Sequence, residues 1–161
     1  MTPRILSHVA LALALCASGC LGATPDDLAR DALPDDGQSE GPLHRAGQPC
    51  LLCHSERGGT SPYFAVAGTV YDVDGVTPRV GVQVVLEDAA HLVAVPTTNS
   101  AGNFMVDERD WTPVFPITVE LDDGANRISM RSSIGREGGC TFCHMAALSA
   151  RSVGPVVIGV F

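Results

Sequence analysis

The chain has no lysine, few aromatic residues and no long hydrophobic run. All ten basic residues are arginines, set against eighteen acids, which gives a formal net charge of −8. Nucleic-acid binding needs a basic face, so we expect no nucleic-acid partner. Aromatic residues make up only 5% of the 161 residues. Any core must therefore be built from small aliphatic side chains, in one modest domain.

Residues 1–19 have the pattern of a bacterial export signal. Arg4 gives a positive start to an apolar stretch that is too short to span a bilayer. Cys20 follows residues 17–19 (ASG), which resemble a lipobox except that Ala stands where Leu is usual. We expect Cys20 to carry lipid; the alternative is an ordinary signal peptide cut nearby. By the same resemblance, Leu21 favours an outer-membrane lipoprotein of the bacterial envelope, facing the periplasm or the cell surface.

Residues 20–47 are expected to form a flexible acidic tether. Residues 21–47 hold six acids, three prolines and four glycines, without a sustained apolar period. Such a segment buries too little surface to offset its ordering entropy. Only residues 26–33 suggest a helical turn or two. The remaining residues, 48–161, would form the folded domain.

Alternation of apolar and polar residues after residue 64 predicts β-structure. We expect short strands at 64–71, 80–86, 92–97, 104–106, 116–121 and 126–130. Asp74-Gly75 and residues 122–124 (DDG) supply turn signals between them. The expected fold class is therefore mainly β: a small antiparallel β-sandwich at about residues 64–131, flanked by two short segments.

Residues 64–121 resemble a carboxypeptidase-regulatory-like, transthyretin-like β-sandwich. The resemblance is carried by residues 68–70 (GTV), the Asp74-Gly75 turn, residues 81–84 (GVQV) and residues 98–104 (TNSAGNF). It implies an Ig/transthyretin-like fold. Such modules are supports or binding surfaces, so the resemblance says little about activity.

The chemistry lies in two C-x-x-C-H motifs, residues 50–54 (CLLCH, the first motif) and 140–144 (CTFCH, the second motif). This is the c-type haem attachment pattern. Two thiols three positions apart can add to both vinyl groups of one haem, and the adjacent histidine then binds the iron. We therefore predict two covalently bound haem c groups. Their predicted binding residues are Cys50, Cys53, His54, Cys140, Cys143 and His144.

Two other interpretations of the cysteines stay open. The four motif thiols could hold zinc as four thiolates, but this leaves the two adjacent histidines without a role. They could also form two C-x-x-C disulfides in an oxidising compartment. Of the six cysteines, Cys16 lies in the signal and Cys20 would carry lipid. Haem attachment would use the other four, so no cysteine is left without a role.

Each iron has a second axial position, for which few side chains are available. We predict His44, which lies six residues before the first motif, and Met130, which lies ten residues before the second. The alternative for Met130 is core packing at a strand end. Met145 directly follows a motif and would struggle to reach the opposite haem face. Met105 is expected in the core and His91 in a solvated turn.

The layout resembles small dihaem or multihaem c-type cytochromes of bacterial envelopes. The resemblance implies electron transfer between envelope or extracellular redox partners, and self-association into haem arrays would extend such a relay. The acidic balance favours basic redox proteins as partners. No catalytic set is evident, so we do not expect an enzyme. A haem-based gas sensor and an envelope binding or adhesion module are the alternatives.

Overall fold

The computed structural model describes residues 23–145 and 152–159, which divide between two compact units, Met1–Ala32 and Leu33–Phe161. The first unit contains helix α2 (Pro25–Asp31). It begins with a capping box: Thr24 Oγ1 accepts the Asp27 N–H at 3.2 Å, and the Asp27 carboxylate accepts the Thr24 N–H at 2.8 Å. The helix confirms the expected helical turns. The predicted signal peptide and Cys20 lie outside the described residues.

The first sheet of the second unit is built around one strand, β1. Its order is β4-β1-β7, and β8 also pairs with β1. β4 runs antiparallel to β1, whereas β7 and β8 run parallel to it. These strands are β1 (Phe64–Tyr71), β4 (Asn103–Asp107), β7 (Gly138–Gly139) and β8 (Val156–Val157).

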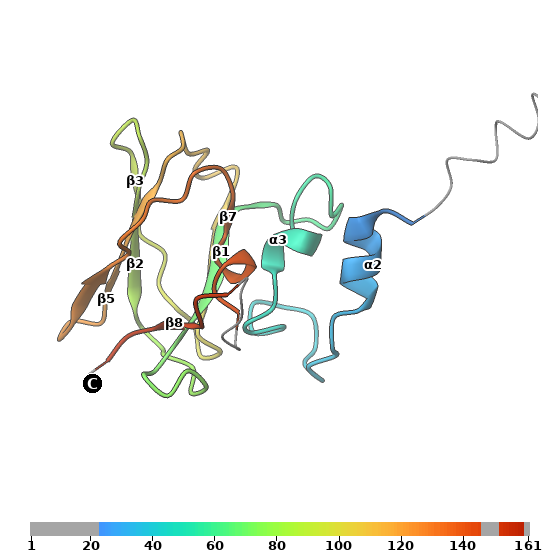
Figure 1. The fold of residues 1–161 in the computed structure, drawn as a ribbon, viewed down its shortest axis with the longest axis horizontal. Helices are drawn as coiled ribbons and strands as arrows, with labels where there is room; N and C mark the ends of the chain where they lie inside the picture. The colour runs from blue at the N-terminus through green and yellow to red at the C-terminus, as the bar shows by residue number, and fades with distance from the viewer. Residues whose placement is uncertain (1–22, 146–151, 160–161) are drawn as a thin grey trace, which may run out of the picture. The chain divides into compact units, whose positions relative to one another are not determined.

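The second sheet is antiparallel throughout, in the order β3-β2-β5-β6. Its strands are β2 (Gln83–Glu87), β3 (Val93–Ala94), β5 (Thr118–Asp122) and β6 (Arg127–Ser129). Val84, Leu86 and Leu121 of this sheet lie in one buried cluster with Val66 and Phe104 of the first. The two sheets therefore share one core, and Figure 1 shows them as neighbouring layers.

The predicted mainly-β class is confirmed, and strands form in all six predicted segments. Within the predicted sandwich at about 64–131 every strand pair is antiparallel, whereas β7 and β8, which lie beyond it, pair parallel to β1. After β6 the chain leaves the second sheet and returns beside β1 in the same direction, a crossover that parallel pairing requires. The second predicted strand also begins later, at Gln83, because Val80 is 60% exposed and Gly81 has a left-handed φ of +79°.

Both faces of β1 are buried. Val66 and Val70 face the core, while the alternate residues Ala67 and Thr69 are only 1% and 2% exposed. Helix α3 (Cys50–Cys53) and the turn η1 (Cys140–Phe142) both contact this strand. In Figure 1 both lie on the side of β1 that faces away from the second sheet.

The segment before α3 is tied to the strands, in contrast to the flexible tether expected up to residue 47. Asn103 Nδ2 donates to the carbonyls of Pro42 and His44, at 3.3 and 3.1 Å. The Gly47 N–H donates to Thr69 Oγ1 at 2.8 Å. The second unit accordingly begins at Leu33, and this part of the predicted tether belongs to it.

Candidate functional site

The first motif forms a single helical turn, α3, on the outer face of β1. The His54 N–H donates to the Cys50 carbonyl at 2.8 Å, which closes the turn around the two cysteines. Leu51, between them, is 8% exposed and anchors the turn. A helical turn brings residues three apart to the same side, as attachment of one haem to Cys50 and Cys53 requires.

The histidine of the first motif has one nitrogen engaged and one available. His54 Nδ1 lies 2.9 Å from the Pro62 carbonyl oxygen, so the tautomer with its proton on Nδ1 completes a hydrogen bond. The ring packs on Phe64, with ring centres 4.7 Å apart. Nε2 then keeps its lone pair. Metal-binding histidines are oriented in this way, with the second nitrogen donating to a carbonyl.

The second motif repeats the backbone geometry of the first. β7 leads into η1, and the His144 N–H donates to the Cys140 carbonyl at 2.9 Å. His144 Nδ1 lies 3.1 Å from the Gly154 carbonyl oxygen. Nδ1 of each motif histidine therefore faces a backbone carbonyl oxygen, although the two carbonyls come from unrelated segments.

Residues 152–154, which we call the C-terminal clasp, hold the second motif in place. The Ser152 hydroxyl accepts the N–H groups of Met145 and Gly154, at 3.0 and 3.1 Å. The Val153 N–H donates to the Cys143 carbonyl at 3.0 Å. Ser152 is only 7% exposed. β8 follows the clasp after Pro155, and residues 160–161 lie outside the described residues.

The two motifs lie against each other. Thr141, inside the second motif, is 5% exposed and donates its hydroxyl to the Gln48 carbonyl at 3.2 Å, just before the first motif. A Cβ placed on Gly139 would lie 3.7 Å from the Leu51 Cβ. Segments some ninety residues apart in sequence are thus packed together on one face of the first sheet.

The first cysteine of each motif, Cys50 and Cys140, is half-buried. Burial raises the pKa of Cys50 to about 11 and that of Cys140 to about 12, and each cysteine's pKa is raised further by a neighbouring cysteine. Cys50 contributes to the shift of Cys140, in agreement with the contact between the motifs. All four motif cysteines are free. In the free chain these two groups are therefore protonated thiols at pH 7.

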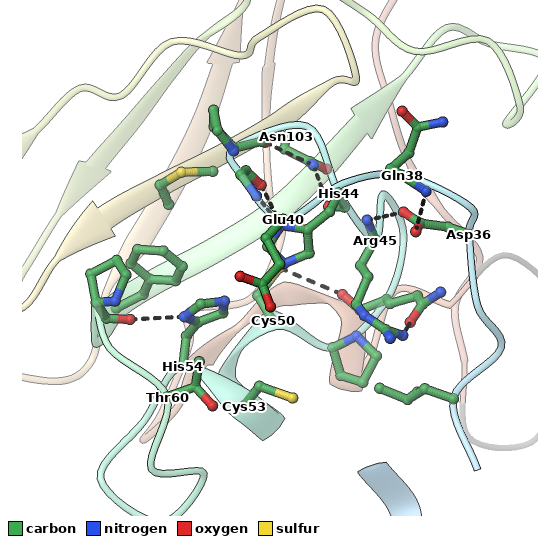
Figure 2. A pocket seen from close by; sticks show the side chains of 18 of the residues that line it. Asp36, Gln38, Glu40, His44, Arg45, Cys50, Cys53, His54, Thr60 and Asn103 are labelled. Atoms are coloured by element: carbon green, nitrogen blue, oxygen red, sulfur yellow. Dashed lines mark hydrogen bonds between the residues drawn. The ribbon is translucent and has the colours of Figure 1, made fainter. Parts of the chain in front are cut away.

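A cleft of about 580 Å³ opens beside the first motif, a volume in the usual range for cofactor sites. Cys50, Cys53 and His54 line one side of it, and residues 33–49 line another. Figure 2 shows the His54 ring with one edge bonded to a backbone carbonyl and its other edge turned toward the side where His44 lies. The cleft, the two thiols and the available nitrogen together fit one haem.

The predicted distal ligands are found in different places. His44 lines the cleft of the first motif. Met130 follows β6, at the edge of the second sheet, whereas the second motif lies against β1 of the first sheet. Its role stays a prediction. The His91 side chain is 84% exposed and bonds Glu87 at 2.6 Å, which raises the pKa of His91.

Sequence reasoning placed Met105 in the core, but it lines the cleft instead. The signal was available: its neighbours Phe104 and Val106 face the core, so strict alternation turns Met105 outward. Asn103 and Thr69, which anchor residues 42–47, were also missed. Both are buried polar side chains, at 3% and 2% exposure, bonded to each other at 2.7 Å.

Comparison with known proteins finds no matching family model, no matching curated protein and no matching solved structure. Among residues 23–145 and 152–159, no helix has the length and apolar character needed to cross a bilayer. Within the same residues, no three His, Cys, Asp or Glu side chains converge as a metal-binding group. A haem site does not need such a group, because the protein supplies only one or two axial ligands to each iron.

Proposed function

We propose that the protein belongs to the dihaem c-type cytochromes and relays electrons between redox partners of the bacterial envelope. In this proposal a transthyretin-like β-sandwich carries one haem at each C-x-x-C-H motif. Each haem supplies a centre that accepts and releases one electron. The chain supplies two cysteines for attachment and one histidine for the iron, and it fixes the position of each set.

The observation that carries the proposal is the shared arrangement of the motif histidines. In both His54 and His144, Nδ1 faces a backbone carbonyl oxygen, at 2.9 and 3.1 Å, so Nε2 is left to bind a metal. Zinc held by four thiolates would not require this orientation. Disulfides in the motifs would not require it either.

Contact between the motifs supports a relay rather than two independent sites. The Thr141 hydroxyl bonds the Gln48 carbonyl across the boundary, and both motifs rest on β1. Haems attached to these turns would be neighbours on one rigid sheet. An electron that enters at one haem then has a short path to the other.

The location of the relay follows from the amino-terminal sequence. We propose that Cys20 is lipidated and that the protein is anchored to the outer membrane. Stable anchoring needs more than one acyl chain, which lipoprotein modification provides. Cys20→Ser should then move the protein to the soluble periplasmic fraction. A native protein that is already soluble, with its mature terminus beyond Cys20, would contradict the anchor.

Stopped-flow reduction tests the relay against the sensor and enzyme alternatives. The relay predicts that both haems are reduced rapidly by a small donor and then bind carbon monoxide slowly. A gas sensor predicts immediate carbon monoxide binding to a five-coordinate reduced haem. Immediate gas binding together with catalytic peroxide consumption would contradict the relay.

A further inference from the structure

The segment that carries His44 is fixed over the first motif by bonds to the sheet. Asn103 Nδ2 donates to the His44 carbonyl, and Thr69 Oγ1 accepts the Gly47 N–H. Asn103 and Thr69 bond each other at 2.7 Å and are almost fully buried, so they form a rigid base. These contacts to the sheet use the backbone of the segment and not the imidazole of His44.

The residue after His44 has an uncommon backbone conformation. Arg45 has a φ of +54°, in the left-handed region that non-glycine residues rarely occupy. Three contacts stabilise it: the Asp36 carboxylate accepts its N–H, and its guanidinium donates to the Pro34 carbonyl at 3.2 Å and to Gln48 Oε1 at 2.9 Å. Conformations of this kind persist where surrounding contacts demand them, and they cluster at functional sites.

The imidazole of His44 stands opposite that of His54 in the cleft. Their ring centres are 5.8 Å apart, and the ring planes are tilted by 39°. Two imidazoles on opposite sides of one metal, with metal–nitrogen bonds of about 2 Å, would have centres roughly 6 Å apart. The observed separation is close to this value.

The tautomer of His44 also fits metal binding. Its Nδ1 faces both the N–H of Gly41, at 3.2 Å, and more closely the Gly41 carbonyl. In the tautomer with its proton on Nδ1, the ring would donate to the Gly41 carbonyl and keep the lone pair on Nε2. His44 thus shares with His54 and His144 a backbone carbonyl next to Nδ1. His91 differs, since a carboxylate faces its Nδ1.

We propose that His44 is the second axial ligand of the iron at the first motif, opposite His54. This inference rests on the proposed function, because it requires haem at that motif. It assigns bis-histidine coordination to the first haem specifically. Such coordination gives a lower potential than His/Met coordination and leaves no open position for a small ligand. Met105 lines the same cleft and is the competing ligand for this position.

The test compares His44→Ala with the matched control His91→Ala, each in the full-length protein matured with haem. His44→Ala should convert one haem from low-spin to high-spin in the electron paramagnetic resonance spectrum. The same haem should then bind carbon monoxide rapidly, and added imidazole should restore the low-spin signal. His91→Ala and Met105→Leu should leave the spectrum unchanged. His44→Met, which keeps a ligand at the position, should retain a low-spin iron with a raised potential.

The outcomes separate this inference from the proposed function. A wild-type protein without covalent haem would overturn both. With two haems attached, an unchanged spectrum in His44→Ala would overturn only the assignment of His44. The same holds if Met105→Leu, rather than His44→Ala, gives the high-spin signal. If His44→Ala prevents haem attachment, His44→Met decides: an iron spectrum identical to that of the wild type would contradict the assignment.

Discussion

At the scale of single residues, Ser152 links the carboxyl-terminal segment to the second motif and its histidine, His144. Its hydroxyl accepts two N–H groups and donates to the Met145 carbonyl at 3.2 Å. Through these bonds it fixes the position of Gly154, whose carbonyl faces His144 Nδ1. A carbonyl in this position makes the imidazole a stronger donor to a metal and favours the oxidised iron. On the proposed function, Ser152 is therefore a positioning residue for a haem at the second motif.

We expect Ser152→Ala to raise the potential of the second haem and leave that of the first unchanged. Stability should fall by about 1–3 kcal/mol, because the buried Gly154 N–H and the partly buried Met145 N–H lose their acceptor. An optical redox titration and a denaturant titration measure the two effects. Ser132→Ala, at an exposed position, is the control. Lower stability with both potentials unchanged would mean that Ser152 has only a structural role.

Asp123 gives a pH dependence that does not involve haem. Its carboxylate accepts the Asn126 N–H at 2.6 Å and the Arg79 guanidinium at 2.9 Å, and these bonds hold its pKa well below the usual value. A depressed folded-state pKa stabilises the fold above the ordinary aspartate pKa of about 4. That stabilisation is lost as the pH falls through the folded-state pKa.

Asp123→Asn should therefore lower the unfolding free energy at pH 7, and the difference from the wild type should shrink below about pH 4. Denaturant unfolding at several pH values provides the measurement. Asp110→Asn, at an exposed position, should have a smaller effect. A difference between wild type and Asp123→Asn that stays constant down to acid pH would contradict this account of the carboxylate.

At the scale of elements, β1 is the support shared by both motifs, and Gly68 makes room on it. A Cβ at Gly68 would lie 2.8 Å from the Cys140 Cβ and 3.0 Å from the Phe104 ring. Both contacts are closer than packed atoms normally allow. The absence of a side chain at this position thus lets the second motif pack beside the strand.

Gly68→Ala should displace the second motif and lower stability by about 1–3 kcal/mol, as overpacking does. Haem content at the second motif should fall relative to the first, measured by mass spectrometry of proteolytic fragments. Gly135→Ala is the matched control, since a Cβ there meets nothing within 4 Å. Normal haem content and stability in Gly68→Ala would show that β1 does not constrain the second motif in this way.

The strands and the two motifs could be predicted from sequence because their signals are local. Alternation marks β1, β2 and β4, and the C-x-x-C-H spacing marks the segments that form α3 and η1. Contacts between distant segments could not be predicted. Residues 33–47 appear acidic and flexible, yet Asn103 and Thr69 bind their backbone, which no composition reveals. The parallel pairing of β7 and β8 with β1 could not be predicted either. It depends on where the distant carboxyl-terminal part of the chain packs against the first sheet.

At the scale of the whole molecule, the proposed relay depends on how the charge balance steers a redox partner. The chain carries a formal charge of −8, and haem propionates would make the surface more negative. Opposite charges attract over a distance set by the ionic strength, about 10 Å at 0.1 M salt. The electrostatic field of this negatively charged protein therefore favours a cationic partner.

Reduction of the protein by a cationic complex, such as a ruthenium ammine, should slow as salt concentration rises. Reduction by an anionic donor such as dithionite should accelerate over the same range. Stopped-flow spectroscopy at low and high ionic strength measures both rates. Equal salt dependence for the two donors would mean that net charge does not steer the encounter.

The central claim is that both motifs carry covalent haem, and the intact mass of the denatured protein tests it most directly. The protein would be produced in a host that matures c-type cytochromes, beside a Cys140→Ala/Cys143→Ala variant. The account predicts the mass of the mature chain plus two haem groups, and one haem fewer in the variant. A mass equal to the polypeptide alone, in a colourless protein that contains zinc, would contradict it.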